Sequence, residues 1–264
     1  MSKKLPKILA VVGLTASGKS SLGIQIAKEI GGEIIAADSR TVYRGMDIGT
    51  AKPVGEKSKS DLAIERQGQK NKNISELFSE KSLTVEGIPH WGLDLVNPDE
   101  HFTAADFKEY AEKKIEEILK RGNVPMLVGG TGLYVQGVID NFTFEKTMGE
   151  PKYDALQLGI MIDREVVYDR IDARVDKMIA EGLVDEVRGL RDKYGCETKA
   201  MTGIGYRQIC AFFDGYLKLR DAIAVVKLET RHYAKRQTTW FKRDDRIVWV
   251  EGFKEAMEEV NDFL

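Results

Sequence analysis

Short apolar runs alternate with longer amphipathic stretches along most of the chain. The run Lys7–Val12 is apolar and is followed at once by Gly13, a pattern typical of a buried strand. In Ser20–Ile30 the apolar residues recur four apart, which predicts a helix, and Glu33–Asp38 is predicted to be a second strand. Strand, glycine-rich turn, helix and strand in this order form the βαβ unit of a parallel sheet.

The same alternation continues toward the C-terminus. Ala104–Lys120 is predicted to be an amphipathic helix, because Phe107, Ala111 and Ile115 fall on one stripe. Further strands are predicted at Val124–Val128, Leu156–Ile162 and Ile247–Val250, and further helices at Arg164–Ala180, Leu183–Tyr194 and Asp221–Lys242. This order predicts an α/β fold in which helices flank a parallel sheet, with a helical C-terminal part.

One long segment interrupts the alternation. Residues 55–81 are polar and charged and lack a sustained apolar period, although a short helix is predicted near Ile74–Ser79. This composition favours a mobile surface excursion, which we extend over residues 55–86. Because no linker separates two large parts of the chain, we predict a single domain over residues 1–264.

Composition excludes several classes of protein. The net charge of −2 does not attract nucleic acid to the whole molecule, so RNA binding has to come from a local basic patch. Only three histidines are present, which argues against a zinc site, and Cys196 and Cys210 are predicted to be reduced thiols, as in a cytoplasmic protein. The apolar run Ile8–Val12 is far too short to span a membrane, so no membrane partner is expected.

Gly13–Ser20 matches the full spacing of a Walker A motif. Small residues let backbone N–H groups surround phosphate oxygens, and the helix that follows directs its positive end toward them. Lys19 adds a positive charge, and Ser20 can hold Mg²⁺. Since a predicted strand precedes the motif and a predicted helix follows it, we expect a P-loop NTPase-like sheet that binds a phosphorylated or diphosphorylated small molecule.

Three further features stand at the ends of predicted strands, at the edge where ligands bind in an open parallel sheet. Asp38 is a candidate general base or metal-shell carboxylate, but Asp-Ser pairs also cap turns, and its position alone does not separate these interpretations. Gly129–Gly132 fits a close approach of a ligand as well as a tight strand-to-helix turn. Asp163 resembles a Walker B carboxylate, although its place before a helix favours an N-cap.

The segment Arg231–Arg243 mixes five Lys or Arg residues with three aromatic residues. On a helix, Arg231, Lys235 and Lys242 fall near one face. Such cations can bind RNA phosphates or a diphosphate. Most charged runs are solvated helix faces with their aromatic residues in the core, and without further context that interpretation is favoured.

Several separate strings resemble the tRNA dimethylallyltransferase family, also called tRNA isopentenyltransferases. The matching strings are Gly13–Ser20, Ala37–Ser39, Val42–Pro53, Gly87–His90, Ala104–Phe107, Val128–Tyr134, Gly203–Gln208 and Thr230–Gln237. Many unrelated proteins share a P-loop, whereas Gly45–Pro53 and Tyr233–Gln237 are much more specific to this family.

The resemblance implies that dimethylallyl diphosphate is the donor and that the adenine beside the tRNA anticodon is the acceptor. The exocyclic amine attacks the allylic carbon and diphosphate leaves, so the P-loop would bind the leaving group and not hydrolyse ATP. By the same resemblance Asp38 orients the amine and takes its proton, Thr15 contacts the amine or the diphosphate, and Lys19 completes the catalytic set. The target base has to leave the anticodon-loop stack to reach the site.

The resemblance also implies which residues bind each substrate. Diphosphate would be bound by Thr15, Ala16, Ser17, Gly18, Lys19 and Ser20, with Mg²⁺ at Ser20 neutralising the developing charge. The tRNA anticodon stem-loop would contact Asp38, Ser39, Arg40, Thr41, Thr131, Gly205, Tyr206, Arg207, Arg231, Lys235, Arg236 and Gln237. This assignment favours RNA binding by the basic segment Arg231–Arg243 over the interpretation as a solvated helix face. The protein is expected to be a cytoplasmic monomer.

The chain departs from the family pattern in places. Leu14 stands where the family usually has Pro, and Trp91 replaces a usual His. The family's helical insert domain, which embraces the anticodon stem-loop, is reduced here to a short loop near residues 145–152. Because the implied catalytic residues lie elsewhere in the chain, the chemistry is expected to survive this loss.

Three other functions remain open. A related prenyltransferase that acts on free adenine nucleotides is favoured by the missing insert and disfavoured by Tyr233–Gln237. A P-loop small-molecule kinase would transfer phosphate from ATP, but no arginine-rich lid is evident. A nucleotide-binding regulatory module without catalysis is disfavoured by the intact Lys19, Ser20 and Asp38.

Overall fold

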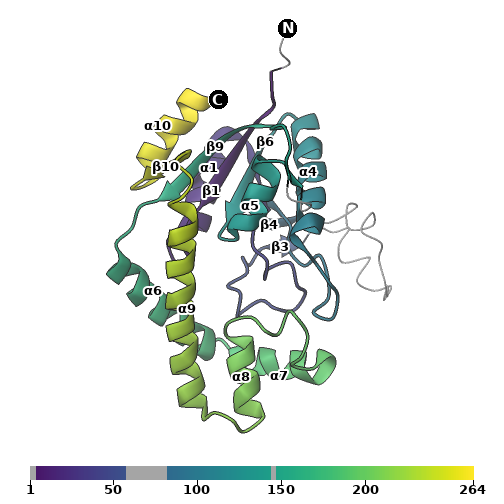
Figure 1. The fold of residues 1–264 in the computed structure, drawn as a ribbon, viewed down its shortest axis with the longest axis vertical. Coiled ribbons are helices and arrows are strands. Elements are labelled where there is room, and N and C mark those ends of the chain that lie inside the picture. The colour runs from purple at the N-terminus through teal and green to yellow at the C-terminus, as the bar shows by residue number, and fades with distance from the viewer. Residues whose placement is uncertain (1–3, 58–81, 144–146) are drawn as a thin grey trace.

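A mostly parallel sheet forms the centre of the molecule (Figure 1). The computed structural model describes residues 4–57, 82–143 and 147–264. The strands of this sheet are β1 (Lys7–Val12), β2 (Gly32–Ala36), β3 (Glu56–Lys57), β4 (Leu83–Val85), β5 (Ile88–Trp91), β6 (Val124–Gly129), β9 (Asp154–Ile160) and β10 (Ile247–Val250). Their order is β10-β9-β1-β6-β2-β5-β4-β3. The pairs β5–β4 and β4–β3 are antiparallel, and the others are parallel. The predicted parallel α/β sheet is confirmed.

Helices pack on both faces of this sheet. α1 (Lys19–Ile30) and α10 (Phe253–Phe263) pack on one face, and α4 (Ala104–Lys120) and α5 (Gly132–Ile139) pack on the other. The remaining helices pack mainly on one another and form a helical part beyond the sheet (Figure 1): α6 (Arg164–Ala180), α7 (Leu183–Tyr194), α8 (Tyr206–Phe213) and α9 (Leu219–Phe241). Five of the six helices that the sequence predicts are confirmed, whereas α5, α8 and α10 were missed. The first two of these are only 8 residues long, so their apolar period hardly repeats. Among the described residues, no helix combines the length and apolar character needed to cross a bilayer.

Side chains along β1 alternate between two cores. Ile8, Ala10 and Val12 belong to a cluster with α4, α5 and α7–α9, whereas Leu9 and Val11 pack with α1 and α10. Successive side chains of a strand point to opposite faces, so a strand covered on both faces has to be apolar throughout. This explains why the first strand is an unbroken apolar run, and it fixes the P-loop at the end of a rigid element.

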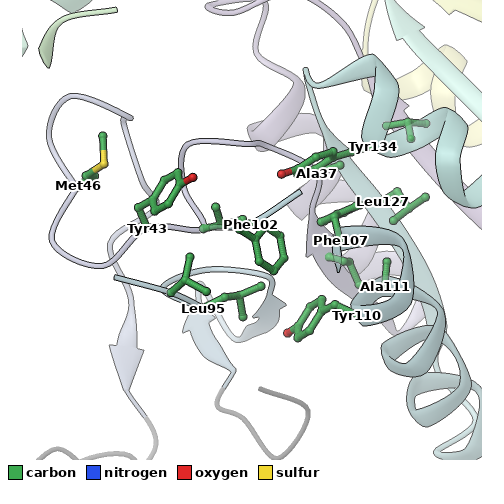
Figure 2. Packing of buried hydrophobic residues seen from close by; sticks show 14 of the residues in the cluster. Ala37, Tyr43, Met46, Leu95, Phe102, Phe107, Tyr110, Ala111, Leu127 and Tyr134 are labelled. Atoms are coloured by element: carbon green, nitrogen blue, oxygen red, sulfur yellow. The ribbon is translucent and has the colours of Figure 1, made fainter. Parts of the chain in front are cut away.

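The loop that follows β2 is held against the first of these cores. Tyr43 and Met46 are buried in the same cluster as Leu95 and Phe102 (Figure 2). Tyr43 also forms an isolated parallel bridge with Val96. The loop that carries Gly45–Pro53, one of the two strings more specific to the family, is therefore a fixed part of the fold.

The prediction of a mobile excursion over residues 55–86 is wrong at both of its ends. β3 and β4 belong to the sheet, and β4 pairs in an antiparallel way with β5 through a turn at Glu86 and Gly87. These edge strands are only two and three residues long, which leaves no period to recognise in the sequence. The helix predicted near Ile74–Ser79 lies outside the described residues.

The place of the expected insert holds a small hairpin. β7 (Phe142–Thr143) pairs in an antiparallel way with β8 (Thr147–Met148), and β9 begins at Asp154. The division of the chain into one domain, with the insert reduced to a loop near residues 145–152, stays a prediction.

The prediction of two reduced thiols is wrong. Cys196 and Cys210 form a disulfide, with their Cα atoms 6.2 Å apart. Cys196 follows α7 and Cys210 lies in α8, so the bond spans the connection that includes Gly203 and Gly205. The packing of α7 on α8 brings the two sulfurs together, and no local pattern in the sequence encodes that packing.

Breaking this disulfide is expected to destabilise the protein. The two cysteines are 14 residues apart, and the chain-entropy account gives about 3 kcal/mol for closing a loop of roughly 15 residues. We expect a Cys196→Ser/Cys210→Ser variant to lose about 2–3 kcal/mol in free energy of unfolding, measured by urea titration without reductant. In excess dithiothreitol the wild type should match the variant. Equal stability of the two proteins without reductant would contradict the prediction.

Candidate active site

The P-loop joins β1 to α1 in the predicted place. Gly18 is the N-cap of α1 and has a φ of 98°, a conformation that favours glycine. Ser17 N donates to Leu14 O at 3.3 Å and closes the turn. The first amides of a helix have no partner within it. The loop therefore presents N–H donors and the positive end of α1 to the same point, as anion binding requires.

A buried hydroxyl in the P-loop lacks a partner. Ser17 is only 3% exposed, and its Oγ forms no hydrogen bond. Leaving such a group unpaired costs roughly 1–3 kcal/mol. A phosphate oxygen that accepts a hydrogen bond from Ser17 would remove this cost. The loop is thus built for a ligand with acceptor oxygens.

Lys19 places a positive charge in the same loop. Its Nζ donates to Leu14 O at 3.0 Å. Burial lowers the pKa of Lys19 to about 8, the charge of Asp38 opposes this shift, and the charge of Arg174 adds to it. Lys19 therefore lies close enough to both groups to feel their charges, and the negative charge of a bound diphosphate would raise its pKa again.

Donor affinity is expected to fall as the pH rises above 8. Lys19 is protonated below a pKa of about 8 and loses its charge as the pH passes that value. If the charged form binds the diphosphate, affinity should drop about fivefold between pH 8 and 9. Isothermal titration of the wild type with dimethylallyl diphosphate would measure this change. A Lys19→Ala variant, whose residual affinity should be constant over the same interval, is the control, and an equal decline in both proteins would refute the prediction.

Asp38 lies two residues beyond β2, near the P-loop. β6 separates β1 from β2, but all three strands are parallel and so end at the same edge of the sheet. Asp38 and Thr15 line one cavity of about 530 Å³. The Oδ1 atom of Asp38 accepts a hydrogen bond from Arg40 N at 2.8 Å. The turn-capping interpretation of Asp38 is therefore confirmed, and this cap also fixes the carboxylate at the cavity.

Other residues that line the cavity come from distant parts of the chain. The start of α8 contributes Gly205, Tyr206 and Arg207, and α9 contributes Tyr233 and Arg236. Figure 1 shows α8 beside one end of the long α9, whose other end lies near β10. One cavity thus joins the phosphate-binding loop, a fixed carboxylate and a wall with exposed cations.

Comparison with known proteins identifies this arrangement. The family model described as IPP transferase matches residues 79–151 and 143–244 of the chain. A tRNA dimethylallyltransferase from Geobacter metallireducens is 37% identical in an alignment 312 residues long, gaps included. The alignment covers 93% of this chain and 92% of the relative. The chain belongs to the IPP transferase family.

Solved structures of two relatives have the same fold. A tRNA isopentenylpyrophosphate transferase from Staphylococcus epidermidis aligns with a TM-score of 0.79 at 30% identity and covers 97% of this chain and 99% of its own. The full-length enzyme from Bacillus halodurans gives the same score and identity, covering 97% and 95%. The IPP transferase fold therefore extends over nearly the whole chain.

The residues that the family resemblance assigns to tRNA separate into two groups. Those that line the cavity are Asp38, Ser39, Arg40, Gly205, Tyr206, Arg207 and Arg236. Outside it, Thr41 is buried, and Arg231 Nε donates to Asp172 Oδ1 at 3.1 Å, so its charge is compensated. Lys235 is exposed on α9. Seven of the twelve assigned residues thus line the cavity, and Lys235 is exposed outside it.

Two of the assigned residues support the site from behind. Gln237 is buried, accepts a hydrogen bond from Thr15 N at 2.8 Å and donates to Gly130 O at 2.9 Å. Thr131 Oγ1 accepts from Ser39 N at 3.0 Å and shares a hydrogen bond with the Tyr233 hydroxyl. Because both ends of the Gln237 amide are used inside the protein, we reassign Gln237 from RNA contact to support of the P-loop.

The turn interpretation of Gly129–Gly132 is confirmed. α5 begins at Gly132, directly after the turn. A Cβ on Gly129 would lie 2.1 Å from Ala37 O, and one on Gly132 would lie 2.1 Å from Trp240 Nε1. Protein atoms therefore fill the space that we also considered for a ligand. Asp163 does hold the N-cap position of α6, but its side chain forms no capping hydrogen bond.

Sequence patterns missed Arg174, a second cation at the P-loop. Its Nη1 lies 3.4 Å from Thr15 Oγ1, and burial lowers its pKa. Arg174 sits within α6, whose helical pattern does not distinguish it from the other arginines there. Packing of α6 against α9, with ion pairs between them such as Asp176–Lys227, brings Arg174 to the site. Tyr233 was also missed as a cavity residue, although it lies in one of the strings quoted for the family.

The P-loop offers few ligands for a metal ion. No group of three His, Cys, Asp or Glu side chains that could hold a metal ion occurs among the described residues. Ser20 is exposed at the start of α1. Mg²⁺ commonly takes one or two protein ligands and completes its shell with substrate phosphates and water. The donor set of this IPP transferase therefore fits an ion that arrives with the diphosphate.

Proposed function

We propose that this protein transfers a dimethylallyl group from dimethylallyl diphosphate to the exocyclic amine of the adenine adjacent to the anticodon in tRNA, releasing diphosphate. The observation that carries the proposal is one cavity lined by Thr15 of the P-loop, by Asp38 and by the start of α8. Membership in the IPP transferase family and the names of the relatives support the same activity.

The P-loop is the leaving-group site in this proposal. Ser17 Oγ has a free hydrogen-bond donor, and Lys19 and Arg174 bring two positive charges. Negative charge builds on the diphosphate as its bond to the allylic carbon breaks. Donors that are already in place stabilise this charge without reorganisation, which lowers the barrier.

Asp38 serves the acceptor. An adenine amine is a weak nucleophile because its lone pair is delocalised into the ring, so alignment with the allylic carbon has to supply much of the rate. The new bond joins the amine nitrogen to that carbon, and the amine proton passes to the Asp38 carboxylate. The hydrogen bond from Arg40 N holds the carboxylate in one orientation for this transfer.

Mg²⁺ would be held by the Ser20 hydroxyl together with diphosphate oxygens. When bound, it would neutralise charge on the leaving group. RNA would approach the exposed side chains of Arg207, Lys235 and Arg236, and the target base would leave the loop stack to enter the cavity. The monomeric state and the cytoplasmic location stay predictions.

Acceptor choice tests the proposal. The purified protein is incubated with dimethylallyl diphosphate and Mg²⁺, and with either an anticodon stem-loop RNA or AMP. Mass spectrometry should find one dimethylallyl group added to the RNA. Modification of AMP alone would establish the free-nucleotide alternative, which the short hairpin in place of the insert favours. Phosphate transfer from ATP without use of the allylic diphosphate would establish the kinase alternative.

A further inference from the structure

A carboxylate outside the cavity binds two segments that line it. Glu186 of α7 accepts four hydrogen bonds. Its Oε2 accepts from Asp47 N at 3.0 Å and from Ile48 N at 2.7 Å. Its Oε1 accepts from Gly49 N at 3.0 Å and from the Tyr206 hydroxyl at 2.6 Å. One side chain thus joins a loop after β2 to the first residue of α8.

This contact is strong by its chemistry. Consecutive backbone N–H groups that converge on one point form an anion-binding nest. Hydrogen bonds to an ionised acceptor are about twice as strong as neutral ones. Burial and the nearby charge of Glu186 raise the pKa of Tyr206 well above its usual value, so its hydroxyl stays a donor. All four bonds depend on the two carboxylate oxygens being in place.

The two joined segments form one wall of the cavity. Gly49, Thr50 and Tyr206 line it together with Asp38. A Cβ on Gly49 would lie 2.6 Å from the Tyr206 hydroxyl oxygen, so the ring packs directly on the Gly49 backbone. Glu186 is not among the lining residues. It can affect the cavity only through the residues that it holds.

Lys52 fixes the other side of the same loop. Its buried Nζ donates to Tyr43 O at 2.8 Å, to Asp47 Oδ1 at 2.6 Å and to Asp94 Oδ1 at 2.5 Å. Lys52 ties the loop to the core, whereas Glu186 ties it to Tyr206. The hydrogen bonds of Glu186 described above all go to the loop and to Tyr206. The loss of the Glu186 carboxylate should therefore loosen the wall beside Asp38 and leave the P-loop intact.

We propose that Glu186 is a positioning residue for the acceptor, which sets the wall of Gly49 and Tyr206 against which the adenine-bearing RNA binds. This inference rests on the proposed function, because it assigns that wall to the acceptor and not to the donor.

Glu186→Gln tests the inference, because glutamine keeps the size of the side chain and replaces one acceptor oxygen with a donor. We expect the KM for anticodon stem-loop RNA to rise at least about tenfold, since small displacements of binding groups have large effects. The KM for dimethylallyl diphosphate should stay within about twofold of the wild type. Asp185→Asn is the matched control, since its carboxylate pairs with Arg188 on the same helix and should leave both constants unchanged. Equal rises of both KM values would overturn the inference.

Tyr206→Phe separates positioning from folding. It removes one of the four donors and should also raise the acceptor KM alone. If Glu186 acts through Tyr206, the variant that combines Glu186→Gln with Tyr206→Phe should show no larger rise in the KM for RNA than Glu186→Gln alone. If the two substitutions raise the KM for RNA by independent factors that multiply in the double variant, the inference is overturned. It is also overturned if the melting temperature falls and the KM values for both substrates rise equally. If Glu186→Gln does not fold, an unchanged acceptor KM in Tyr206→Phe would overturn it.

RNA affinity without donor distinguishes this inference from the proposed function. A fluorescent anticodon stem-loop RNA is titrated with wild type, Glu186→Gln and Asp185→Asn. If only Glu186→Gln binds the RNA more weakly, the inference is supported, whether or not the wild type transfers a dimethylallyl group. The absence of transfer by the wild type would contradict the proposed function alone. Equal affinity in all three proteins would overturn the inference even if the wild type is an active transferase.

Discussion

Asp38→Asn is expected to lower kcat for RNA prenylation by about 10³-fold, within the usual range for loss of a general base. The amide oxygen can still accept the hydrogen bond from Arg40 N, so the turn survives, but the side chain can no longer take a proton. Asp38→Ala removes both functions and should lower kcat at least as much. The KM for the donor should change little in either variant. Single-turnover kinetics with saturating donor would measure the chemical step.

The pH of this experiment matters, because the charge of Asp38 raises the pKa of Lys19 against the effect of burial. Without that charge Lys19 loses its proton at a lower pH, so the assay should be run near or below pH 7. Asp163→Asn is the control, since this exposed carboxylate lies outside the cavity and should leave kcat unchanged. Full turnover of Asp38→Ala would show that this carboxylate has no catalytic role and would revive the non-catalytic reading of the site.

Lys19→Ala is expected to lower kcat/KM for dimethylallyl diphosphate by about 10²–10³-fold, the usual effect of removing one preorganised donor. Lys19 is half-buried in the same loop as the buried Ser17, where water screens its charge less than at the surface. Donor affinity should fall, whereas RNA affinity measured without donor should not change.

Lys28→Ala is the matched control for this variant. Lys28 lies on the same helix but is exposed and pairs with Glu86, away from the P-loop. Its loss should leave the donor kinetics as they are. Wild-type donor affinity in Lys19→Ala would mean that the P-loop holds something other than the diphosphate.

The sequence by itself determined the phosphate-binding end of this protein. The strand before Gly13, the helix after it and the residues between them depend only on neighbours in the chain, because turn conformation and helix capping are local. The apolar run of β1 likewise shows that both faces of this strand are covered. Strings of residues then indicated the family, which the comparisons confirm.

Only the tertiary structure decided which residues meet in the cavity. Arg174 reaches Thr15, and Glu186 reaches Gly49 and Tyr206, across long stretches of chain. Hydrogen bonds between distant segments depend on how helices pack on one another, and a helix has the same local pattern whichever neighbour it has. The same reason explains why Gln237 was predicted as an RNA contact although it is buried behind the P-loop, and why the Cys196–Cys210 bond was not foreseen.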